Sequence, residues 1–329
     1  MINIVIVGAG NLGSRHLQAL SNISINARIS VIDPSESSLK IAKSRIENIP
    51  YKSSITFDFE KTLENINKNI DIAVISTTAD VRRRAIEDLI NRTSVKKMLL
   101  EKVLFQKISD YDHIDYLFKQ NNIHAWVNCT RRIWPFYKKI VTGLHQSNVK
   151  EINISGSLLG LGSNLIHFID FISFITNTQK YSICFELLDK KIISSKRKGF
   201  IDFSGTIYGV FENGTFFSIS SYEEGSIPQT IKIKSNNSII ILDEGKIEIG
   251  TGSALIAHKR NDWAWQEETF DIPFQSQLTH LVVQQIFQKN SCDLTRYSES
   301  VQLHLPMISG LIDYINQIKN TTGSVCAIT

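Results

Sequence analysis

Three glycines near the start of the chain have the spacing of a phosphate-binding turn. Gly8, Gly10 and Gly13 form the pattern G-x-G-x-x-G directly after the apolar, β-branched run 4–7. In such a turn the first glycine permits a sharp bend, the second lets the backbone approach a pyrophosphate, and the third lets the helix pack closely on the strand. Amide groups at the start of the following helix add partial positive charge. The stretch therefore predicts a site for the pyrophosphate of a dinucleotide.

A carboxylate follows at the distance that a dinucleotide site requires. Asp33 ends a second apolar run, 29–32, twenty residues beyond Gly13. An acidic side chain at this place accepts hydrogen bonds from the ribose hydroxyls of NAD and would repel the 2′-phosphate of NADP. The spacing therefore favours NAD over NADP. We also expect Asn11 and Leu12, inside the glycine turn, to contact the cofactor.

Three side chains further along the chain could handle protons. Lys102 follows a short apolar run, and His167 and Asp170 stand three residues apart in the apolar segment 164–175. Histidine titrates near neutral pH, and a lysine can act when burial or a nearby cation favours its neutral amine. The spacing puts His167 and Asp170 on one face of a helix. A lone histidine there could equally be a hydrogen-bonded core residue, and Asp170 could orient the imidazole or bind a substrate.

Two other pairs of residues allow more than one interpretation. Glu101 could fix the local backbone or Lys102, and Lys102 itself could be a lysine at the surface end of a strand. Arg15 and His16 stand at the start of the first helix. They could approach the pyrophosphate or lie on a solvated helix face. Spacing alone does not decide between these hypotheses.

The first third of the chain alternates strands and helices, as a doubly wound parallel sheet does. The expected strands cover residues 4–7, 29–32, 55–57, 71–76, 98–100 and 124–128, and the expected later helices cover 35–47, 61–66, 80–90 and 111–119. Ligands bind at the carboxyl edge of such sheets. We therefore expect Thr77, Thr78, Glu101 and Lys102, at strand ends, to line the cofactor site. Residues 1–125 are predicted to form a Rossmann dinucleotide-binding domain.

Residues 126–329 have a different pattern. The expected helices cover 131–145, 164–175, 276–289 and 297–319, and the expected strands 151–159, 206–211, 215–221, 231–234, 238–242 and 246–249. Strands that follow one another directly, with Asn213-Gly214 as a hairpin signal, predict a large, mostly antiparallel sheet with helices on one face. The predicted fold class is therefore α/β, with a second α+β domain for substrate binding and oligomerisation. The uncovered face predicts a homo-oligomer, a dimer or tetramer. Trp263 and Trp265 alternate as on one face of a strand and could lie at that interface or in the core.

The composition excludes several other classes of protein. The 329 residues are 42% hydrophobic and 21% charged with a net charge of +4, and the basic clusters are short and scattered, which argues against a nucleic-acid partner. The four cysteines lack C-x-x-C spacing, so we expect neither a metal site nor a disulfide framework. No apolar run reaches the roughly 18 residues of a membrane span, and Met1 leads directly into a predicted strand. We expect a cytoplasmic protein without a membrane partner.

Three features together resemble the Gfo/Idh/MocA family of NAD(P)-dependent oxidoreductases. They are the glycine turn, the pair Glu101-Lys102, which matches the family's E-K-P motif, and His167 with Asp170, which matches its G-x-H-x-x-D helix. The resemblance covers essentially the whole chain. It implies a Rossmann domain followed by a domain with an open, mostly antiparallel sheet. It also implies hydride transfer between nicotinamide and a small-molecule substrate, a sugar, cyclitol or nucleotide-linked sugar, in a pathway such as polysaccharide biosynthesis.

The resemblance further implies roles for individual residues. Lys102 and His167 occupy the positions of the family's lysine and histidine beside the reacting hydroxyl or carbonyl. Arg131, Arg132 and Tyr137 follow the sixth predicted strand, where family members often have residues that face substrate or nicotinamide. Arginines would suit a substrate with phosphate groups because they bind phosphate through two parallel hydrogen bonds.

The sequence departs from the family pattern at three positions. Leu165 stands in place of the glycine of G-x-H-x-x-D, and Val103 in place of the proline of E-K-P, so we expect a trans peptide bond between Lys102 and Val103. Many members carry an aspartate four residues before the histidine. Here that residue is Ser163, and the following Asn164 can hydrogen-bond a substrate but cannot serve as a carboxylate base. An altered proton relay, a non-catalytic NAD-binding sensor or scaffold, and a permanently retained cofactor are the resulting hypotheses.

Overall fold

The structure is a computed structural model that describes residues 1–47, 49–52, 54–144, 147–245 and 250–329. The described chain forms two compact units. The first contains residues 1–105, 109–128 and 273–298, and the second contains residues 106–108, 129–272 and 299–329. The segment 273–298 thus belongs to the first unit although it follows most of the second unit in sequence.

The first unit is built on a sheet of seven strands in the order β19-β8-β7-β5-β1-β2-β3. The strands are β1 (Ile2–Val7), β2 (Ala27–Ile32), β3 (Ile55–Glu60), β5 (Ile72–Ile75), β7 (Lys97–Leu100), β8 (His124–Val127) and β19 (Thr295–Arg296). All neighbouring pairs are parallel except β19 with β8. The short strands β4 (Asn69–Ile70) and β6 (Ser94–Val95) form a separate parallel pair. The doubly wound parallel sheet predicted from the sequence is confirmed.

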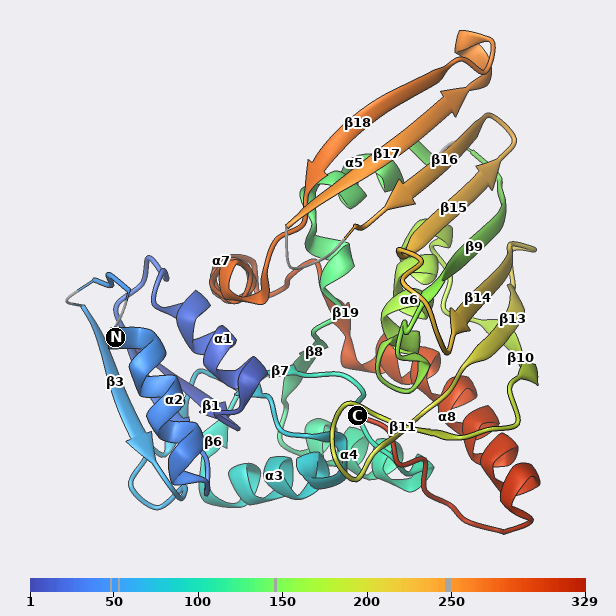
Figure 1. Cartoon of the computed structure of the whole chain (residues 1–329). Coiled ribbons are helices and arrows are strands. Elements are labelled where there is room, and N and C mark those ends of the chain that lie inside the picture. Colours follow the sequence, from blue (N-terminus) through green and yellow to red (C-terminus); the bar gives the residue numbers. More distant parts are fainter. Residues whose placement is uncertain (48, 53, 145–146, 246–249) are drawn as a thin grey trace. The chain divides into compact units, whose positions relative to one another are not determined.

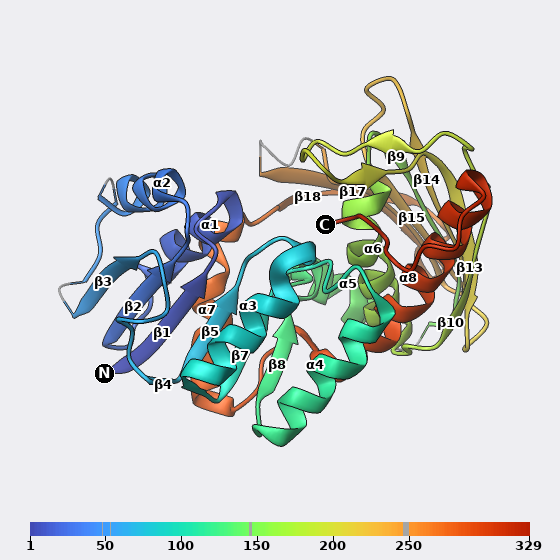
Figure 2. The ribbon, with the colours of Figure 1, turned by 90° about the horizontal axis from the view of Figure 1, so that it is seen from below.

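Helices cover both faces of this sheet (Figures 1 and 2). The helices are α1 (Asn11–Leu20), α2 (Glu36–Glu47), α3 (Ala79–Arg92), α4 (Ile108–Gln120) and α7 (Thr279–Lys289), with the 3₁₀ turn η4 (Gln275–Gln277) before α7. Helices α1, α2 and α7 lie on one face, and α3 and α4 on the other. Their apolar residues and the β-branched strands form the core, which is what a sheet buried on both faces requires.

The prediction of a helix over residues 61–66 is wrong, because this segment forms bends and turns. Six residues are too few for a helix to be stable without tertiary support. Local side chains also offer other hydrogen bonds, since Thr62 accepts from the Glu64 amide and Asn65 donates to Glu60 at 3.4 Å. The helix expected from an Asp80 N-cap begins instead at Ala79, with Asp80 in its first turn.

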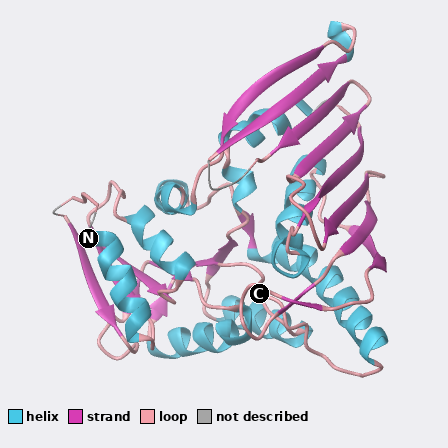
Figure 3. Cartoon of the chain, in the orientation of Figure 1, coloured by secondary structure: helices cyan, strands magenta, loops and turns pink. Residues whose placement is uncertain are grey.

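The second unit is built on a sheet of eight strands in the order β10-β13-β14-β9-β15-β16-β17-β18 (Figure 1). In Figure 3, which colours strands magenta, this sheet is the larger group of arrows. Its strands are β9 (Val149–Ser157), β10 (Tyr181–Leu188), β13 (Gly205–Phe211), β14 (Phe216–Tyr222), β15 (Thr230–Ser235), β16 (Ser238–Asp243), β17 (Thr251–His258) and β18 (Trp265–Asp271). Only β14 and β9 run parallel, so the predicted mostly antiparallel sheet is confirmed. Asn213-Gly214 forms the expected hairpin, with Gly214 at φ +85° and its amide bonded to Phe211.

Helices cover one face of this second sheet. They are α5 (Pro135–Leu144), α6 (Leu161–Thr176) and most of α8 (Tyr297–Lys319), with the 3₁₀ turn η1 (Thr130–Ile133) before α5. Buried residues alternate with half-buried or exposed ones along β13 to β17, so a single face is buried. Outside the sheet, β11 (Ile193–Ser194) pairs with β12 (Ile201–Asp202).

The strand expected at 246–249 lies outside the described residues. Trp263 and Trp265 do not alternate along one strand, because Trp263 lies in a turn at φ +62° and only Trp265 belongs to β18. Both indoles are exposed, at 41% and 52%.

Among the described residues, no helix combines the length and the apolar character needed to cross a membrane. The same residues contain no group of three or more His, Cys, Asp or Glu side chains that could hold a metal ion.

Candidate functional site

The glycine turn between β1 and α1 combines one crowded position with one open position. A Cβ atom on Gly13 would lie 1.8 Å from the carbonyl oxygen of Gly8 and 2.8 Å from Ser76 Oγ. Only glycine therefore allows the helix to approach the strand so closely. A Cβ atom on Gly10 would meet nothing within 4 Å. The backbone of Gly10 thus has open space beside it, as a bound pyrophosphate would need.

The polar groups around this turn are those that a phosphate requires. Gly10 is the N-cap of α1, and no side chain caps the helix there, so the first-turn amides retain their hydrogen-bonding capacity. At the end of the neighbouring strand, the hydroxyl of Thr77 is buried and has no hydrogen-bond partner among the described residues. Buried polar groups are almost always satisfied, so this hydroxyl is suited to hydrogen-bond a bound ligand. The residues present therefore fit the pyrophosphate of a dinucleotide.

Asp33 is fixed at the carboxyl end of β2. Its Oδ2 accepts the amide of Ala9 at 2.7 Å and its Oδ1 accepts the amide of Ser35 at 2.8 Å. The side chain is half-buried, and each carboxylate oxygen can accept more than one hydrogen bond. The geometry leaves Asp33 able to bind two ribose hydroxyls.

Arg45, which the sequence did not single out, reaches the first turn of α1 from the end of α2. It donates to the carbonyl of Asn11 at 3.2 Å and to the hydroxyl of Ser14. Burial and the nearby charge of Arg15 lower the pKa of Arg45. Arg15 itself is exposed and donates to Gln18. A helix-terminal arginine gives no local signal of such a contact, because the contact spans 34 residues.

His16 occupies a place that neither sequence hypothesis anticipated. It is completely buried, with Nε2 at 2.9 Å from Glu101 Oε1 and Nδ1 at 2.8 Å from Thr279 Oγ1. Burial alone would raise the pKa of Glu101. The contact with His16, the charge of Lys102 and a hydrogen bond from Asn128 outweigh burial, and the pKa lies below its ordinary value. Glu101 is thus a buried carboxylate, adjacent in sequence to the half-buried Lys102.

The expectation of a trans bond before Val103 is wrong, because the Lys102–Val103 peptide bond is cis. The expectation considered only the intrinsic preference of the dipeptide. In the fold the Val103 side chain is completely buried, and the buried Arg82 donates to the carbonyl oxygens of Val103 and Leu104. These tertiary contacts fix the segment that carries Lys102.

In the second unit, helix α6 carries His167, Asp170 and Asn164. His167 is half-buried, whereas Asp170 is 1% exposed and accepts a hydrogen bond from Arg132 Nε at 2.7 Å. The sequence predicted Arg132 and Asp170 as substrate ligands, but the two side chains bind each other. Asn164 is half-buried, and its amide group donates to the carbonyl of Leu159.

Tyr137 differs most from its expected place at a substrate. It is completely buried, and its hydroxyl donates to Glu244, which also accepts two hydrogen bonds from Arg131 at 2.8 and 2.6 Å. Burial and the charge of Glu244 raise the pKa of Tyr137 well above its ordinary value. The residues form a closed, buried network, with Gln229 also donating to Glu244. Tyr137 is therefore part of the core in this unit.

Asp202 is a second residue that the sequence did not reveal. Its Oδ1 accepts the amides of Gly162 at 2.6 Å and Phe203 at 2.8 Å, and burial raises its pKa. Its Oδ2 has no hydrogen bond among the described residues. A Cβ atom built on Gly160 would lie 2.9 Å from Ser163 Oγ, 3.3 Å from Asn164 Nδ2 and 3.4 Å from Asp202 Oδ2. A hydroxyl, an amide and a carboxylate therefore converge at the start of α6.

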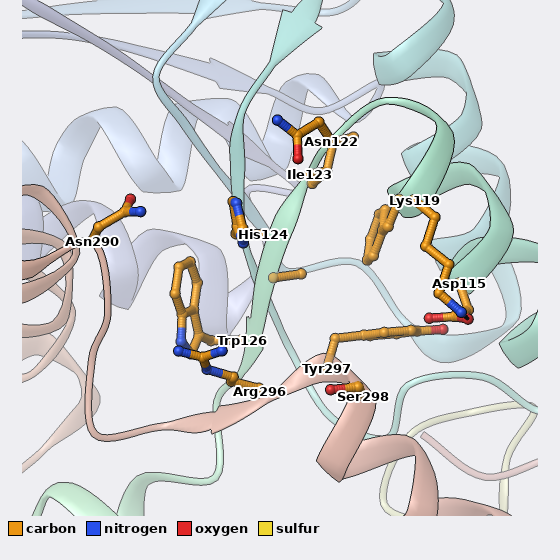
Figure 4. A pocket seen from close by; sticks show the side chains of 12 residues that line it. Asp115, Lys119, Asn122, Ile123, His124, Trp126, Asn290, Arg296, Tyr297 and Ser298 are labelled. Atoms are coloured by element: carbon orange, nitrogen blue, oxygen red, sulfur yellow. Dashed lines mark hydrogen bonds and ion pairs between the residues drawn. The ribbon is translucent and has the colours of Figure 1, made fainter.

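A separate pocket of ≈ 440 Å³ opens beside β8 and β19 in the first unit (Figure 4). His124 and Trp126 project from one face of β8, and Lys119 and Tyr297 lie on the other side of the strand. None of the residues expected to bind cofactor or substrate lines this pocket. It is therefore not part of the glycine-turn site.

The model of the Gfo/Idh/MocA group, described as an oxidoreductase family with an NAD-binding Rossmann fold, matches residues 2–129. These residues contain the glycine turn, Asp33 and Lys102. A comparison with curated protein sequences gave no match.

Solved structures resemble the whole chain. An oxidoreductase from Agrobacterium radiobacter in complex with NAD⁺, L-tartaric acid and magnesium is 13% identical with a TM-score of 0.73, covering 96% of this chain and 97% of that one. UDP-N-acetylglucosamine 3-dehydrogenase from Acidithiobacillus ferrooxidans is 10% identical with a TM-score of 0.66 and 98% coverage of both chains. The transcriptional regulator Gal80p from Kluyveromyces lactis is 15% identical with a TM-score of 0.70, covering 99% and 95%. At these identities the likeness shows a common fold.

Proposed function

We propose that the chain is an NAD-dependent oxidoreductase acting on a sugar or nucleotide-linked sugar, because residues 2–129 match the model of the Gfo/Idh/MocA oxidoreductase family. The observation that carries the proposal is the glycine turn. Its open space at Gly10, uncapped helix start and orphaned Thr77 hydroxyl together fit a bound dinucleotide. In this proposal the reaction moves a hydride between the nicotinamide and a substrate carbon that carries a hydroxyl or carbonyl oxygen.

The cofactor residues have distinct roles in this proposal. The turn residues Asn11, Leu12 and Gly13 hold the pyrophosphate through backbone amides, and Asp33 accepts hydrogen bonds from the adenosine ribose. Thr77 and Thr78 line the remaining length of the dinucleotide. NAD, once bound, supplies the group that takes or gives the hydride. The carboxylate of Asp33 makes NAD the preferred cofactor, since it would repel the 2′-phosphate of NADP.

In this proposal His167 and Lys102 together serve the transfer of the proton of the substrate hydroxyl. Oxidation of a hydroxyl requires a group that takes its proton, and reduction requires one that gives it. We assign proton transfer to His167, since Ser163 cannot act as a carboxylate base. Lys102 polarises the substrate oxygen with its charge. The half-burial of both side chains in their own units leaves each able to reach a ligand.

The substrate class is supported by the polar group at the start of α6. Asp202 presents a carboxylate oxygen that accepts hydrogen bonds, Asn164 an amide nitrogen that donates them and Ser163 a hydroxyl that can do both, a combination that suits a ligand with several hydroxyl groups. UDP-N-acetylglucosamine 3-dehydrogenase, which shares the fold, acts on a nucleotide-linked sugar. We propose that Asp202 binds sugar hydroxyls. The sequence placed no carboxylate here, because Asp202 and Gly162 are 40 residues apart.

We also propose that the protein is a homo-oligomer through the uncovered face of the second sheet. This face carries exposed apolar side chains at 38–60% exposure: Leu187, Val210, Phe216, Tyr222 and Leu255. Exposed apolar side chains on the open face of a sheet suit burial by a second copy of the chain. Light scattering at micromolar concentration should give a dimer or tetramer, and a monomer would contradict the proposal.

A second candidate function is a non-catalytic NAD-binding sensor or scaffold. It is favoured by Ser163 in place of a carboxylate and by the fold shared with the regulator Gal80p. One experiment separates the two candidates. The purified protein is given NAD or NADH with a panel of hexoses, inositols and UDP-linked sugars or their keto forms, and NADH absorbance is followed. Turnover of one compound supports the enzyme, whereas NAD binding without any turnover supports the sensor.

A further inference from the structure

The pocket beside β8 and β19 contains a buried hydrogen-bond donor without a partner. Trp126, one of the residues that line this pocket of ≈ 440 Å³, is 2% exposed. Its indole Nε1–H group has no hydrogen-bond partner among the described residues. Buried polar groups are almost always satisfied, and an indole nitrogen can only donate. The pocket therefore suits a ligand that brings an acceptor to this indole.

A positively charged donor lies next to the same indole. Arg296 of β19 is paired with Trp126 of β8, so the two side chains are direct neighbours on one face of the sheet. Figure 4 shows the guanidinium group beside the indole. Arg296 is exposed, and within the described parts of the chain its guanidinium has neither an ion pair nor a hydrogen bond. Two donors cannot satisfy each other, whereas an anionic oxygen can accept from both.

Two further polar side chains line this part of the pocket. His124 stands two residues before Trp126 and projects from the same face of β8, and Asn290 is the C-cap of α7 (Figure 4). Both side chains are exposed. The amide of an asparagine carries two N–H groups, and a neutral imidazole carries one. Donors from β8, β19 and the end of α7 thus line one pocket.

The charge around these donors is positive. Among the described residues that line the pocket, Asp115 is the only acid, and it forms an ion pair with Lys119. Lys119 lies on the other side of β8, away from the indole (Figure 4). The charge of Arg296 is therefore available to an anion. A guanidinium binds phosphate through two parallel hydrogen bonds.

We propose that this pocket binds a small molecule through a phosphate group, which accepts hydrogen bonds from Arg296, Trp126 and Asn290. A phosphate ester offers three strong acceptor oxygens where a carboxylate offers two, so the number of donors favours phosphate. The volume lies within the range of about 300–1,000 Å³ that is typical of small-molecule sites, which leaves room for the organic part of a phosphate ester. No residue of the glycine turn lines the pocket, so the inference is independent of the proposed function.

The indole N–H group of Trp126 reports on this site directly. The chain has four tryptophans, so protein with isotope-labelled tryptophan gives four indole signals in an NMR spectrum, and Trp126→Phe identifies one of them. Titration with inorganic phosphate or with glycerol phosphate should move that signal until it saturates, because the indole gains a hydrogen bond. Acetate and glycerol at the same concentrations should leave the signal in place.

A charge variant and a matched control measure the contribution of the arginine. Arg296→Gln should weaken the binding of glycerol phosphate about 10–100-fold in a calorimetric titration, since it removes the charged donor. Arg84→Gln removes the same charge from an 87% exposed side chain of the same unit, outside the pocket, and should leave the affinity unchanged. Arg296 is also exposed, so the calorimetric comparison decides the matter even if Trp126→Phe fails to fold.

Two results would overturn the inference. One is a Trp126 signal that phosphate does not move, or that acetate moves equally. The other is an equal affinity for glycerol phosphate in Arg296→Gln and Arg84→Gln. The affinity of Arg296→Gln for NAD should match that of the wild type, because the pocket is separate from the glycine turn. A parallel loss of NAD binding would contradict that separation and with it the inference.

Discussion

The glycine turn of the first unit and the charged network of the second unit use their polar groups in opposite ways. At the turn, the helix start has no side-chain cap and Thr77 has a buried hydroxyl without a partner among the described residues. In the second unit, Arg131 and Arg132 are bound to Glu244 and Asp170. The first region leaves donors for a ligand, whereas the second consumes most of its charge internally. The comparison teaches that clustered charge alone does not mark a ligand site.

The first way to sharpen this comparison is to remove the side chain that is proposed to react in each unit. Lys102→Ala and His167→Ala should each lower turnover about 10²–10⁴-fold, the usual cost of losing a positioned acid or base, with NAD affinity nearly unchanged. Since both residues serve one proton transfer in the proposed mechanism, the double variant should be little worse than either single variant. Steady-state kinetics on a turned-over sugar tests this. Wild-type turnover in His167→Ala would make the histidine a core residue.

The second way is to break the internal network. Glu244→Gln leaves Arg131 buried without its counter-charge, and loss of one partner of a buried pair typically costs about 3–5 kcal/mol. Chemical denaturation should therefore show a large loss of stability, while NAD affinity of the folded protein stays the same. Glu268→Gln, which removes an exposed pair with Lys139, is the control and should hardly change stability. Equal stability of the two variants would refute a structural role for the network.

The third way compares two glycines of the same turn. Gly13→Ala forces a Cβ atom against the Gly8 carbonyl and should destabilise the protein by about 1–3 kcal/mol, as overpacking does. Gly10→Ala meets no atom within 4 Å, so stability should be unchanged while NAD affinity falls. Thermal unfolding and NAD titration of both variants separate the effects. A Gly10→Ala variant that binds NAD as wild type does would show that the pyrophosphate lies elsewhere.

The smallest effect concerns cofactor choice. Asp33→Ser removes one negative charge near the 2′-position, where a pair of charges 4 Å apart in water is worth about 1 kcal/mol. The preference for NAD over NADP should therefore fall about fivefold. Fluorescence titration with both cofactors measures it. Tighter NADP binding by the wild type, or an unchanged preference in Asp33→Ser, would contradict the assignment.

The sequence predicted the parts of the site that depend on local backbone geometry. The spacing of Gly8, Gly10 and Gly13 specifies a turn of few residues, and the crowding at Gly13 explains why that pattern is so informative. The periodicity of apolar residues predicted both sheets for the same reason, since alternation along a strand is a local property.

Contacts between residues far apart in the sequence could not be predicted from local patterns. His16 meets Glu101 across 85 residues and Arg131 meets Glu244 across 113, so no local spacing indicates either pair. The peptide bond before Val103 was mispredicted for the same reason, because buried contacts from Arg82 override a local preference. Asp202 reaches the start of α6 from a segment that carries no recognisable motif.

Direct transfer of hydrogen between cofactor and sugar tests the central claim most directly. NADH that carries deuterium on nicotinamide C4 is incubated with the protein and the keto forms of the sugar panel, and the products are analysed by mass spectrometry. The account predicts deuterium at one carbon of one product, lost in Lys102→Ala and His167→Ala. NADH that binds tightly but transfers no deuterium to any panel compound, while the wild-type protein is fully folded, would contradict the account and leave a sensor or scaffold in its place.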